Sequence, residues 1–375
     1  MRVGAMRIGL DVSPLARNRA GIGTYVAHLL TALVRIAPEQ EYWFYTPQPL
    51  PESDRVVFGG YPHVQIVSCP ERLMGLRATW DQVDVFHGLN FKLRGWGGAG
   101  GVVTIYDLSV DRLGLPSRKL FGQRSSFLRT RRTARRASRV VTISEQSAAD
   151  IVDLFGVPRE RIAIVSPAVR PECTPGVEAG TIAAVKMRYG ISRDAYVLSG
   201  GGAEPRKNIA MLIEAFARAP RLRETMHLVV LGGMDRGGEA IREVVARVGL
   251  ESAVIFSGHV PLDDVRALYA GCALFAFPSL YEGFGMPPLE AMACGAPVVC
   301  SNASALPDAV GDAALLVDPR DPDGWAQAMT RVLEETELRE HLCQRGALRA
   351  KAFSWEQSAR DLLAVYEDVM KGRAV

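Results

Sequence analysis

The chain has 375 residues, more than a single hydrophobic core commonly holds, so we expect two domains. With 48% hydrophobic and 23% charged residues and a formal net charge of +3, it has the composition of a folded globular protein, which excludes a disordered or fibrous chain. No apolar run reaches the roughly 18 residues of a membrane-spanning helix, and the six cysteines lack CxxC or metal-ligand spacing, so we expect a cytoplasmic protein with free thiols.

The first half of the chain alternates short apolar runs with helical segments. A β-rich run at 7–12 is followed by a helix predicted over about 24–35, which has Tyr25, Leu29 and Leu33 on one face. Further runs are near-continuously apolar, as parallel strands covered on both faces tend to be. They lie at 42–45, 64–67, 83–87, 102–106 and 140–143.

A second series of strands follows the stretch 166–180, which is rich in Pro, Glu and Gly and is the expected interdomain linker. These strands are predicted at 196–199, 228–231, 254–256, 273–276, 298–300 and 314–316. Two blocks of strand and helix alternation predict an α/β chain of two doubly wound domains, 1–172 and 173–352. In such sheets ligands bind at the carboxyl ends of the strands.

The loop 199–208 combines three glycines with two cations, Arg206 and Lys207, before a helix predicted over 209–218. Glycines let the backbone approach a ligand closely, and cations beside a helix N-terminus attract anions. The loop therefore predicts a pyrophosphate site. The alternative is a solvated basic pair before a helix.

Two carboxylates, Glu282 and Glu290, stand eight positions apart on either side of a Gly- and Pro-rich loop. The glycines and prolines between them break any helix in the first half, so Glu290 belongs to the following helix and Glu282 to the loop. Backbone amides at such a helix start can hold a phosphate, and the carboxylates can hold hydroxyls or a developing cation. This chemistry suits a sugar nucleotide, although an ordinary loop before a buried helix is the alternative.

The string SLYEGFGMPPLEAMACGAPVV at 279–299 resembles the E-x7-E segment of retaining glycosyltransferases of the GT-B fold, family 4, or glycosyl transferases group 1. The loop with Arg206, Lys207 and Asn208 is similar to the family's R-K-N motif, and the resemblance covers nearly the whole chain. It implies two Rossmann-like domains facing a cleft, with the acceptor mainly on the first and the donor mainly on the second. It also implies that the last helix, in 353–375, crosses back to the first domain.

The resemblance assigns roles to individual residues. Arg206 and Lys207 would bind the diphosphate and stabilise the leaving group, Glu282 would face the donor sugar, and Glu290 would hold the ribose hydroxyls. It implies further donor contacts at Gly202, His259, Val260, Phe284, Gly285, Met286 and Leu289. For His259 and Val260 these contacts would come from the main chain, and a simple helix-entry turn is the alternative. No cofactor is implied, and no metal ion, because the two cations can neutralise the pyrophosphate.

In the first domain, the glycine loop 20–25 is a poor dinucleotide fingerprint, because Val26 stands where the third glycine belongs. The resemblance implies that Gly21 and Gly23 close over donor phosphates or acceptor, rather than forming a bare turn. His87 ends a predicted strand and is a catalytic candidate, with a structural histidine as the alternative. Tyr106 stands where many relatives have a histidine that contacts the donor sugar; tyrosine can donate a hydrogen bond but cannot copy the charge behaviour of imidazole.

The segment from Arg112 to Arg139 holds ten Arg or Lys residues and no Asp or Glu, so the rest of the chain is net acidic. Its apolar residues recur at near-heptad spacing, as in Leu120, Phe127 and Ala134. This pattern favours a basic amphipathic helix in peripheral contact with an anionic membrane, on its inner face. A helix lining a cleft for an acidic substrate is the alternative. Nucleic-acid binding is not expected, because no aromatic stacking platform accompanies the charge.

The combined pattern predicts a retaining glycosyltransferase that uses a nucleotide-sugar donor. The motifs are most similar to those of bacterial mannosyltransferases of polysaccharide or O-antigen assembly, so GDP-mannose is the favoured donor and a lipid-linked or polysaccharide chain the expected acceptor. A UDP-sugar or dTDP-rhamnose is the alternative donor. A catalytically silent nucleotide- or glycan-binding protein, favoured by Tyr106, and a more distant phosphorylase are rival functions.

Overall fold

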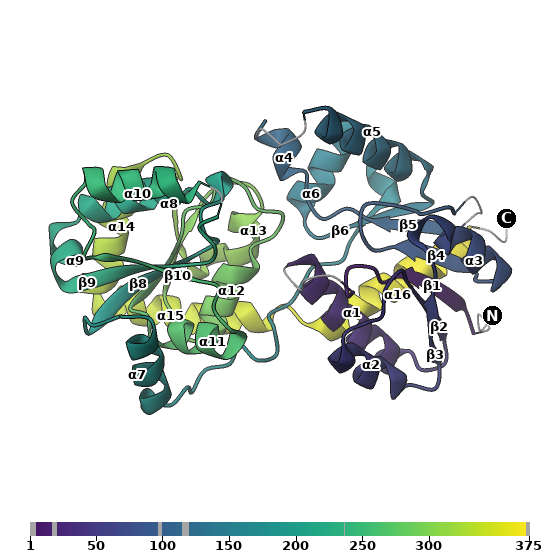
Figure 1. Ribbon diagram of the computed structural model, residues 1–375, viewed down its shortest axis with the longest axis horizontal. Coiled ribbons are helices and arrows are strands. Elements are labelled where there is room, and N and C mark those ends of the chain that lie inside the picture. Colours follow the sequence, from purple (N-terminus) through teal and green to yellow (C-terminus); the bar gives the residue numbers. More distant parts are fainter. Residues whose placement is uncertain (1–4, 17–20, 97–99, 115–119, 236, 373–375) are drawn as a thin grey trace. The chain divides into compact units, whose positions relative to one another are not determined.

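The computed structural model describes residues 5–16, 21–96, 100–114, 120–235 and 237–372, with the backbone alone at 120–124 (Figure 1). The chain forms two compact units. Unit 1 comprises Met1–Pro167 and Ser354–Val375, and unit 2 comprises Ala168–Phe353. The first boundary lies five residues before the one predicted from the linker composition, and the segment that returns to unit 1 begins at Ser354.

Unit 1 contains a seven-stranded parallel sheet in the order β3-β2-β1-β4-β5-β6-β7. The strands are β1 (Arg7–Asp11), β2 (Glu41–Thr46), β3 (Val64–Ser68), β4 (Val85–Gly88), β5 (Gly101–Thr104), β6 (Arg139–Thr142) and β7 (Ile162–Ile164). The helices are α1 (Ile22–Ile36), α2 (Glu52–Gly59), α3 (Met74–Trp80), α4 (Ser109–Arg112), α5 (Leu120–Arg136), α6 (Glu145–Asp150) and α16 (Trp355–Lys371), with one π-helical turn at Ile151–Phe155 and 3-10 turns at Glu71–Leu73 and Arg159–Arg161.

Unit 2 contains a six-stranded parallel sheet in the order β10-β9-β8-β11-β12-β13. The strands are β8 (Ala195–Gly200), β9 (Met226–Leu231), β10 (Val254–Gly258), β11 (Leu274–Phe277), β12 (Val298–Ser301) and β13 (Leu315–Val317). The helices are α7 (Ala179–Arg188), α8 (Ile209–Ala217), α9 (Pro220–Thr225), α10 (Gly238–Arg247), α11 (Leu262–Gly271), α12 (Met286–Ala293), α13 (Leu306–Val310), α14 (Pro322–Glu334) and α15 (Thr336–Lys351), with 3-10 turns at Pro205–Lys207 and Gly311–Ala313.

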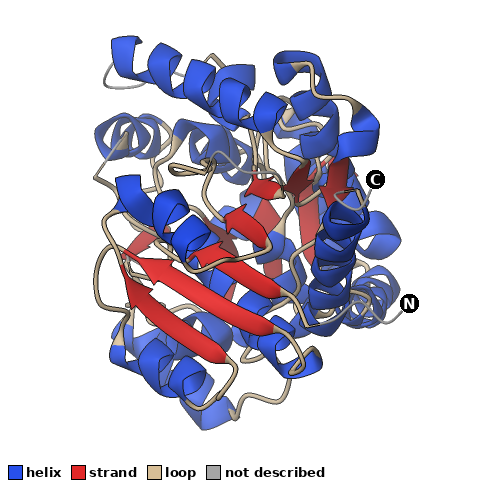
Figure 2. Ribbon diagram, turned by 90° about the vertical axis from the view of Figure 1, so that its right-hand side faces the viewer, coloured by secondary structure: helices blue, strands red, loops and turns tan. Residues whose placement is uncertain are grey.

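Both sheets have the doubly wound arrangement that the alternation of elements predicts, with helices beside the strands (Figure 2). The inner strands are buried on both faces; in β2, for example, Tyr42, Phe44 and Tyr45 have no exposed surface, whereas the edge strands β3, β7, β10 and β13 are partly exposed. In unit 2, Trp325 of α14 is fully buried in the core that α8 and the sheet share. The strand order reverses between β1 and β4 in unit 1 and between β8 and β11 in unit 2. These two switch points are where ligands of such sheets bind.

The last helix, α16, packs against α1 within unit 1 (Figure 1). Its start is capped by Ser354, whose side chain accepts a hydrogen bond from Gln357 N at 3.1 Å. Ser358 Oγ then donates to Ser166 O at 2.6 Å, which fixes the helix to the end of the first long segment of the unit. All six cysteines are free thiols. Among the described residues, no helix has both the length and the apolarity to cross a bilayer.

Candidate functional site

The two loops singled out by their sequence follow β8 and β11, the neighbouring strands at the switch point of unit 2. Residues 201–208 connect β8 to α8, and residues 278–285 connect β11 to α12. Because β8 and β11 are parallel and hydrogen-bonded, both loops leave the same edge of the sheet. The sheet topology thus brings the diphosphate candidate and the first carboxylate to one place.

The glycine loop needs glycine at two positions. Gly201 and Gly202 have φ angles of 115° and 62°, in the region that side chains disfavour. A Cβ on Gly202 would lie 2.4 Å from the carbonyl oxygen of Gly233, and one on Gly201 would meet the Lys207 side chain at 2.6 Å. The loop therefore packs closely against the end of β9, where Gly202 N donates to Leu231 O at 2.8 Å.

Asn208 ties the two loops together. It adopts a left-handed conformation with φ 59°, and its amide nitrogen donates to Pro278 O at 3.2 Å and to Pro319 O at 2.6 Å. The backbone adds a second connection, because Leu280 N donates to Arg206 O at 2.7 Å. The positions of Arg206 and Lys207 are therefore fixed relative to the loop that carries Glu282.

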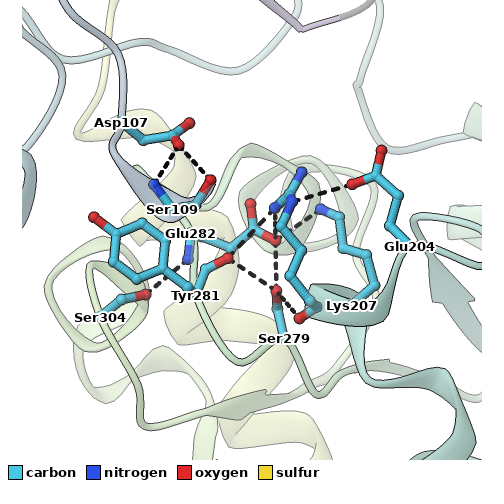
Figure 3. Close-up of polar contacts among 9 residues, drawn as sticks. Asp107, Ser109, Glu204, Lys207, Ser279, Tyr281, Glu282 and Ser304 are labelled. Atoms are coloured by element: carbon cyan, nitrogen blue, oxygen red, sulfur yellow. Dashed lines mark hydrogen bonds and ion pairs between the residues drawn. The ribbon is translucent and has the colours of Figure 1, made fainter. Parts of the chain in front are cut away.

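Glu282 is nearly buried and receives three donors on a single carboxylate oxygen, Oε1 (Figure 3). Lys207 Nζ lies 2.7 Å away, Arg206 NH1 2.9 Å and Ser279 Oγ 2.6 Å. Burial by itself raises the pKa of a carboxyl group, but the charges of Lys207 and Arg206 outweigh it and hold the pKa of Glu282 below its ordinary value. None of these three contacts uses Oε2.

Glu290 lies on α12, as predicted, and is also buried. Its two oxygens pair with Arg170, Oε1 with Nε at 2.6 Å and Oε2 with NH2 at 2.7 Å. Burial raises the pKa of Glu290 above its ordinary value, and the Arg170 guanidinium opposes that shift. The guanidinium of this bidentate pair favours the ionised carboxylate, which has further lone pairs for ribose hydroxyls.

Three residues of this site escaped the sequence analysis: Arg170, Ser279 and Ser304. Ser279 and Ser304 orient the Glu282 loop, since Ser304 Oγ accepts from Glu282 N at 2.8 Å (Figure 3). Ser279 stands inside the quoted string and could have been found there. Arg170 lies in the expected linker, 120 positions before Glu290. No local sequence pattern indicates that the two residues pair.

The start of α12 offers fewer amides than a usual helix. Pro287 and Pro288 have no N–H, so of the first four helical positions only Met286 and Leu289 carry a donor. Gly285 precedes them at φ 130°, where a Cβ would meet Leu306 at 2.9 Å. The side chains of Phe284 and Leu289 are buried, and Phe284 packs on Phe353. Contacts to a ligand from these positions would therefore come from the backbone.

His259 and Val260 directly follow β10, with His259 exposed and Val260 buried. In unit 1, Gly21 caps α1 with φ 50°, and Gly23 is buried in the first turn. The helix starts at Ile22, two residues before the predicted start, so Gly23 is helical and not part of a free loop. Residue 20 of the predicted loop lies outside the described residues.

The His87 side chain is fully buried, and both ring nitrogens have partners. Nδ1 lies 2.7 Å from the Tyr366 hydroxyl and Nε2 lies 2.8 Å from Thr104 Oγ1. These contacts join β4, β5 and α16 within unit 1. Burial lowers the pKa of His87 to about 3, so the ring is neutral. This geometry fits the structural alternative; the catalytic role remains a prediction.

Tyr106 follows β5 and is also buried, between the rings of Tyr25 and Phe91. Its hydroxyl donates to Leu89 O at 2.8 Å. Burial raises the pKa of Tyr106 well above its ordinary value, so the hydroxyl stays protonated. Within the described part of unit 1, the Tyr106 hydroxyl is thus hydrogen-bonded to a backbone carbonyl. Its contact with a donor sugar remains a prediction.

Comparison with known proteins identifies the family. Residues 186–349 match the model of the glycosyl transferases group 1, and residues 20–168 match that of the glycosyl transferase 4-like domain. Over 294 residues the chain is 34% identical to O-antigen chain mannosyltransferase B of Escherichia coli, covering 76% of this chain and 74% of that one. The chain belongs to the glycosyl transferases group 1 family. It is a glycosyltransferase.

Two further comparisons concern relatives and fold. The glycosyltransferase is 33% identical over 228 residues to the serotype-specific mannosyltransferase WbdA of Escherichia coli, which covers 60% of this chain but only 28% of WbdA. The solved structure of Anabaena Alr3699/HepE, in complex with UDP and glucose, superposes with a TM-score of 0.76 at 18% identity, covering 97% of this chain and 100% of that one. The predicted GT-B fold with two Rossmann-like domains is confirmed.

The two carboxylates of the glycosyltransferase are expected to act differently. Glu282→Gln should lower kcat on the order of 10²-fold with little change in nucleoside diphosphate affinity, because it alters charge beside the reacting sugar. Glu290→Gln should instead weaken nucleotide binding. Turnover assays and calorimetric titration measure both effects. Glu204→Gln, which is exposed in the loop 199–208 and paired with Arg206, is the control. Equal loss of nucleotide affinity in both glutamate variants would contradict the assignment.

Arg170 is expected to keep Glu290 ionised. In Arg170→Met the buried carboxyl loses its counter-charge, so its pKa should rise further and nucleoside diphosphate should bind roughly 10- to 100-fold more weakly near neutral pH. Because deprotonation restores the acceptor, affinity in this variant should rise with pH more steeply than it does in the wild type. Arg170→Lys, which keeps the charge, should lie between them. A loss of nucleotide affinity that does not depend on pH would show that Arg170 contributes by packing and not by its charge.

The buried neutral His87 makes stability depend on pH. Its pKa of about 3 in the folded protein lies below the ordinary value of 6.5, so the unfolded chain takes up the proton first on acidification. The stabilising effect is complete above pH 6.5 and is lost as pH falls toward 3, by about 2 kcal/mol at pH 5. Denaturation of wild type and His87→Gln at pH 7.5 and 5 should show the stability difference shrinking at pH 5. A constant difference would mean that His87 is accessible to protons when folded.

Proposed function

We propose that this glycosyltransferase moves mannose from GDP-mannose to a lipid-linked or polysaccharide acceptor, with retention of the anomeric configuration. The observation that carries the proposal is the 34% identity to O-antigen chain mannosyltransferase B over three quarters of both chains. The similarity to WbdA, which is also named a mannosyltransferase, supports mannose as the transferred sugar. The donor would bind unit 2 at the switch point between β8 and β11.

The contacts around Glu282 support a mechanism for the transfer. The diphosphate would lie on the glycine loop beside Arg206 and Lys207, whose charges stabilise the phosphate oxygens as the glycosidic bond breaks. Glu282 Oε2 would accept a hydrogen bond from a sugar hydroxyl and stabilise positive charge on the sugar. Because Oε1 already accepts two hydrogen bonds and an ion pair from Arg206, and the pKa of Glu282 is lowered, this carboxylate is a poor nucleophile. We therefore infer same-face attack within an ion pair, without a covalent intermediate.

Two charges on the protein also support transfer without a metal ion. Arg206 and Lys207 would place two cations against the phosphate oxygens of a nucleoside diphosphate leaving group, and their partners Glu282 and Glu204 offset part of that charge. In enzymes that use Mg²⁺ for this purpose, the metal bridges the phosphate oxygens. We infer that the two side chains take that role here, so turnover should not depend on added divalent cations.

One observation supports a second candidate. The Tyr106 hydroxyl is bound to Leu89 O and the imidazole of many relatives is absent, which favours a nucleotide-binding protein without turnover. A UDP-sugar remains the alternative donor, since the HepE structure holds UDP and glucose. We further propose that the segment from Arg112 to Arg139 brings the enzyme to an anionic membrane where a lipid-linked acceptor resides.

A panel of sugar nucleotides tests the proposed donor. With GDP-mannose and a mannan or O-antigen oligosaccharide acceptor, we expect GDP release and an α-linked product by NMR, undiminished in EDTA. UDP-glucose and dTDP-rhamnose should give at most a tenth of that rate, since sites built to hydrogen-bond a ligand discriminate strongly against mispaired ones. Faster turnover with another sugar nucleotide would identify that compound, and not GDP-mannose, as the donor. Tight GDP binding without any turnover would favour the silent protein.

A further inference from the structure

Two cysteines of unit 2 lie beside the ion pair between Arg170 and Glu290. Cys173 N donates to Arg170 O at 2.9 Å, so a tight turn brings this cysteine back beside the arginine. Cys294 directly follows α12, one turn after the carboxylate, and its N donates to Glu290 O at 3.1 Å. Because two hydrogen bonds join Arg170 to Glu290, they also bring together the cysteines that follow these residues.

The two thiols contact each other. The Cys173 thiol is hydrogen-bonded to the Cys294 sulfur, and each of the two residues is 4% exposed. Cys272 also lies near Cys294, but its own thiol donates to Tyr269 O at 3.2 Å. The cysteine that faces Cys294 is therefore Cys173.

The surroundings favour the thiolate form of Cys294. The hydrogen bond from Cys173 lowers the pKa of the Cys294 thiol. The positive charges of Arg266 and Arg170 act in the same direction, while burial and the charge of Glu290 oppose the shift without reversing it. The same hydrogen bond raises the pKa of Cys173, which stays protonated. This is the arrangement of a reactive cysteine beside a resolving one.

Cys173 lies close to the surface despite its burial. Its neighbours on both sides, at 171–172 and 174–176, are exposed. The stretch is held to α11 by Arg266, whose guanidinium donates to Thr174 O at 3.2 Å and to Pro175 O at 3.5 Å. Local opening of these two long hydrogen bonds exposes the thiol pair without unfolding the rest of unit 2. A small oxidant can therefore reach the pair.

We propose that Cys173 and Cys294 form a reversible oxidation site, at which a hydroperoxide converts the two thiols into a disulfide and thereby weakens nucleotide binding at Glu290. The Cys294 thiolate attacks the O–O bond and becomes a sulfenic acid, and the departing oxygen takes up a proton and leaves as water or an alcohol. The Cys173 thiol then attacks that sulfur, the S–S bond forms, and its proton leaves with the hydroxyl group as water. The two thiols lose two electrons, which the hydroperoxide accepts.

The disulfide changes the nucleotide site because its two ends are tied to Arg170 and Glu290. Bonded sulfur atoms lie closer together than hydrogen-bonded ones, so the turn at Cys173 and the end of α12 must move toward each other. The bidentate pair tolerates little such movement, since both of its hydrogen bonds depend on the orientation of one guanidinium. The inference rests on the proposed role of Glu290 in nucleotide binding and adds redox control to it.

Hydrogen peroxide treatment of the purified protein tests the site. After the remaining thiols are blocked, peptide mapping by mass spectrometry should find a peptide with Cys173 linked to one with Cys294. Calorimetric titration should show GDP binding to the treated protein roughly tenfold more weakly, because the pair of Arg170 with Glu290 is distorted, and dithiothreitol should restore it. The mapping uses the wild type and needs no variant.

Two variants locate the effect. Cys294→Ser removes the reactive sulfur and should keep its GDP affinity through peroxide treatment. Cys343→Ser is the matched control, since it makes the same substitution in the same unit at a more exposed cysteine. This control should lose GDP affinity on treatment as the wild type does. Cys173→Ser leaves Cys294 without a resolving partner and should give no linked peptide. Circular dichroism checks that all three variants fold.

Three results would overturn the proposal. The first is a treated wild type without the link between Cys173 and Cys294, and the second is a linked protein that binds GDP as tightly as the reduced one. The third is an equal loss of GDP affinity in treated Cys294→Ser, which would place the oxidation elsewhere. Failure of the proposed function looks different. The reduced protein then binds no GDP while the linked peptide still forms, and the titration is repeated with the nucleotide that the donor panel identifies.

Discussion

The ion pair between Lys207 and Glu282 is the contact on which the candidate site depends. It joins the loops that follow β8 and β11, which are neighbours in the sheet, although the two residues are 75 positions apart in the chain. A buried carboxylate without a counter-charge would cost several kcal/mol, so each loop is stable in its position only while the other supplies its partner. The glycines at 201 and 202 let the backbone pass close enough for this pairing. Charges fixed in this way need no rearrangement when a diphosphate binds.

The same arrangement recurs at the second carboxylate. Glu290 is held by Arg170, which comes from the beginning of unit 2 and not from the motif itself. Each acidic residue of the E-x7-E segment therefore has a cation that favours its ionised form, but the geometry differs. Glu282 is engaged on one oxygen by three donors, whereas Glu290 is clamped on both oxygens by one guanidinium. This difference is the physical basis for assigning one carboxylate to the sugar and the other to the ribose.

Much of the fold follows from local sequence because parallel strands buried on both faces are nearly continuous apolar runs. The predicted strands match those observed to within a few residues, and the two loops of unit 2 are evident from their glycines and prolines. The strand Ile162–Ile164 was missed, although it is no shorter than Leu315–Val317, which was predicted. Contacts between residues far apart in the sequence could not be predicted either. Arg170 pairs with Glu290, 120 positions away, and His87 contacts Tyr366, 279 positions away. The second contact links β4 to α16 through a buried His87, which no strand-end pattern can reveal.

A structure of the protein with GDP bound tests the central claim most directly. The account predicts the β-phosphate on the glycine loop within hydrogen-bond distance of Arg206 and Lys207. The ribose hydroxyls should contact Glu290 while Arg170 remains paired with it. A nucleotide bound away from the edge where β8 and β11 end, or a ribose that displaces Arg170 from Glu290, would contradict the account.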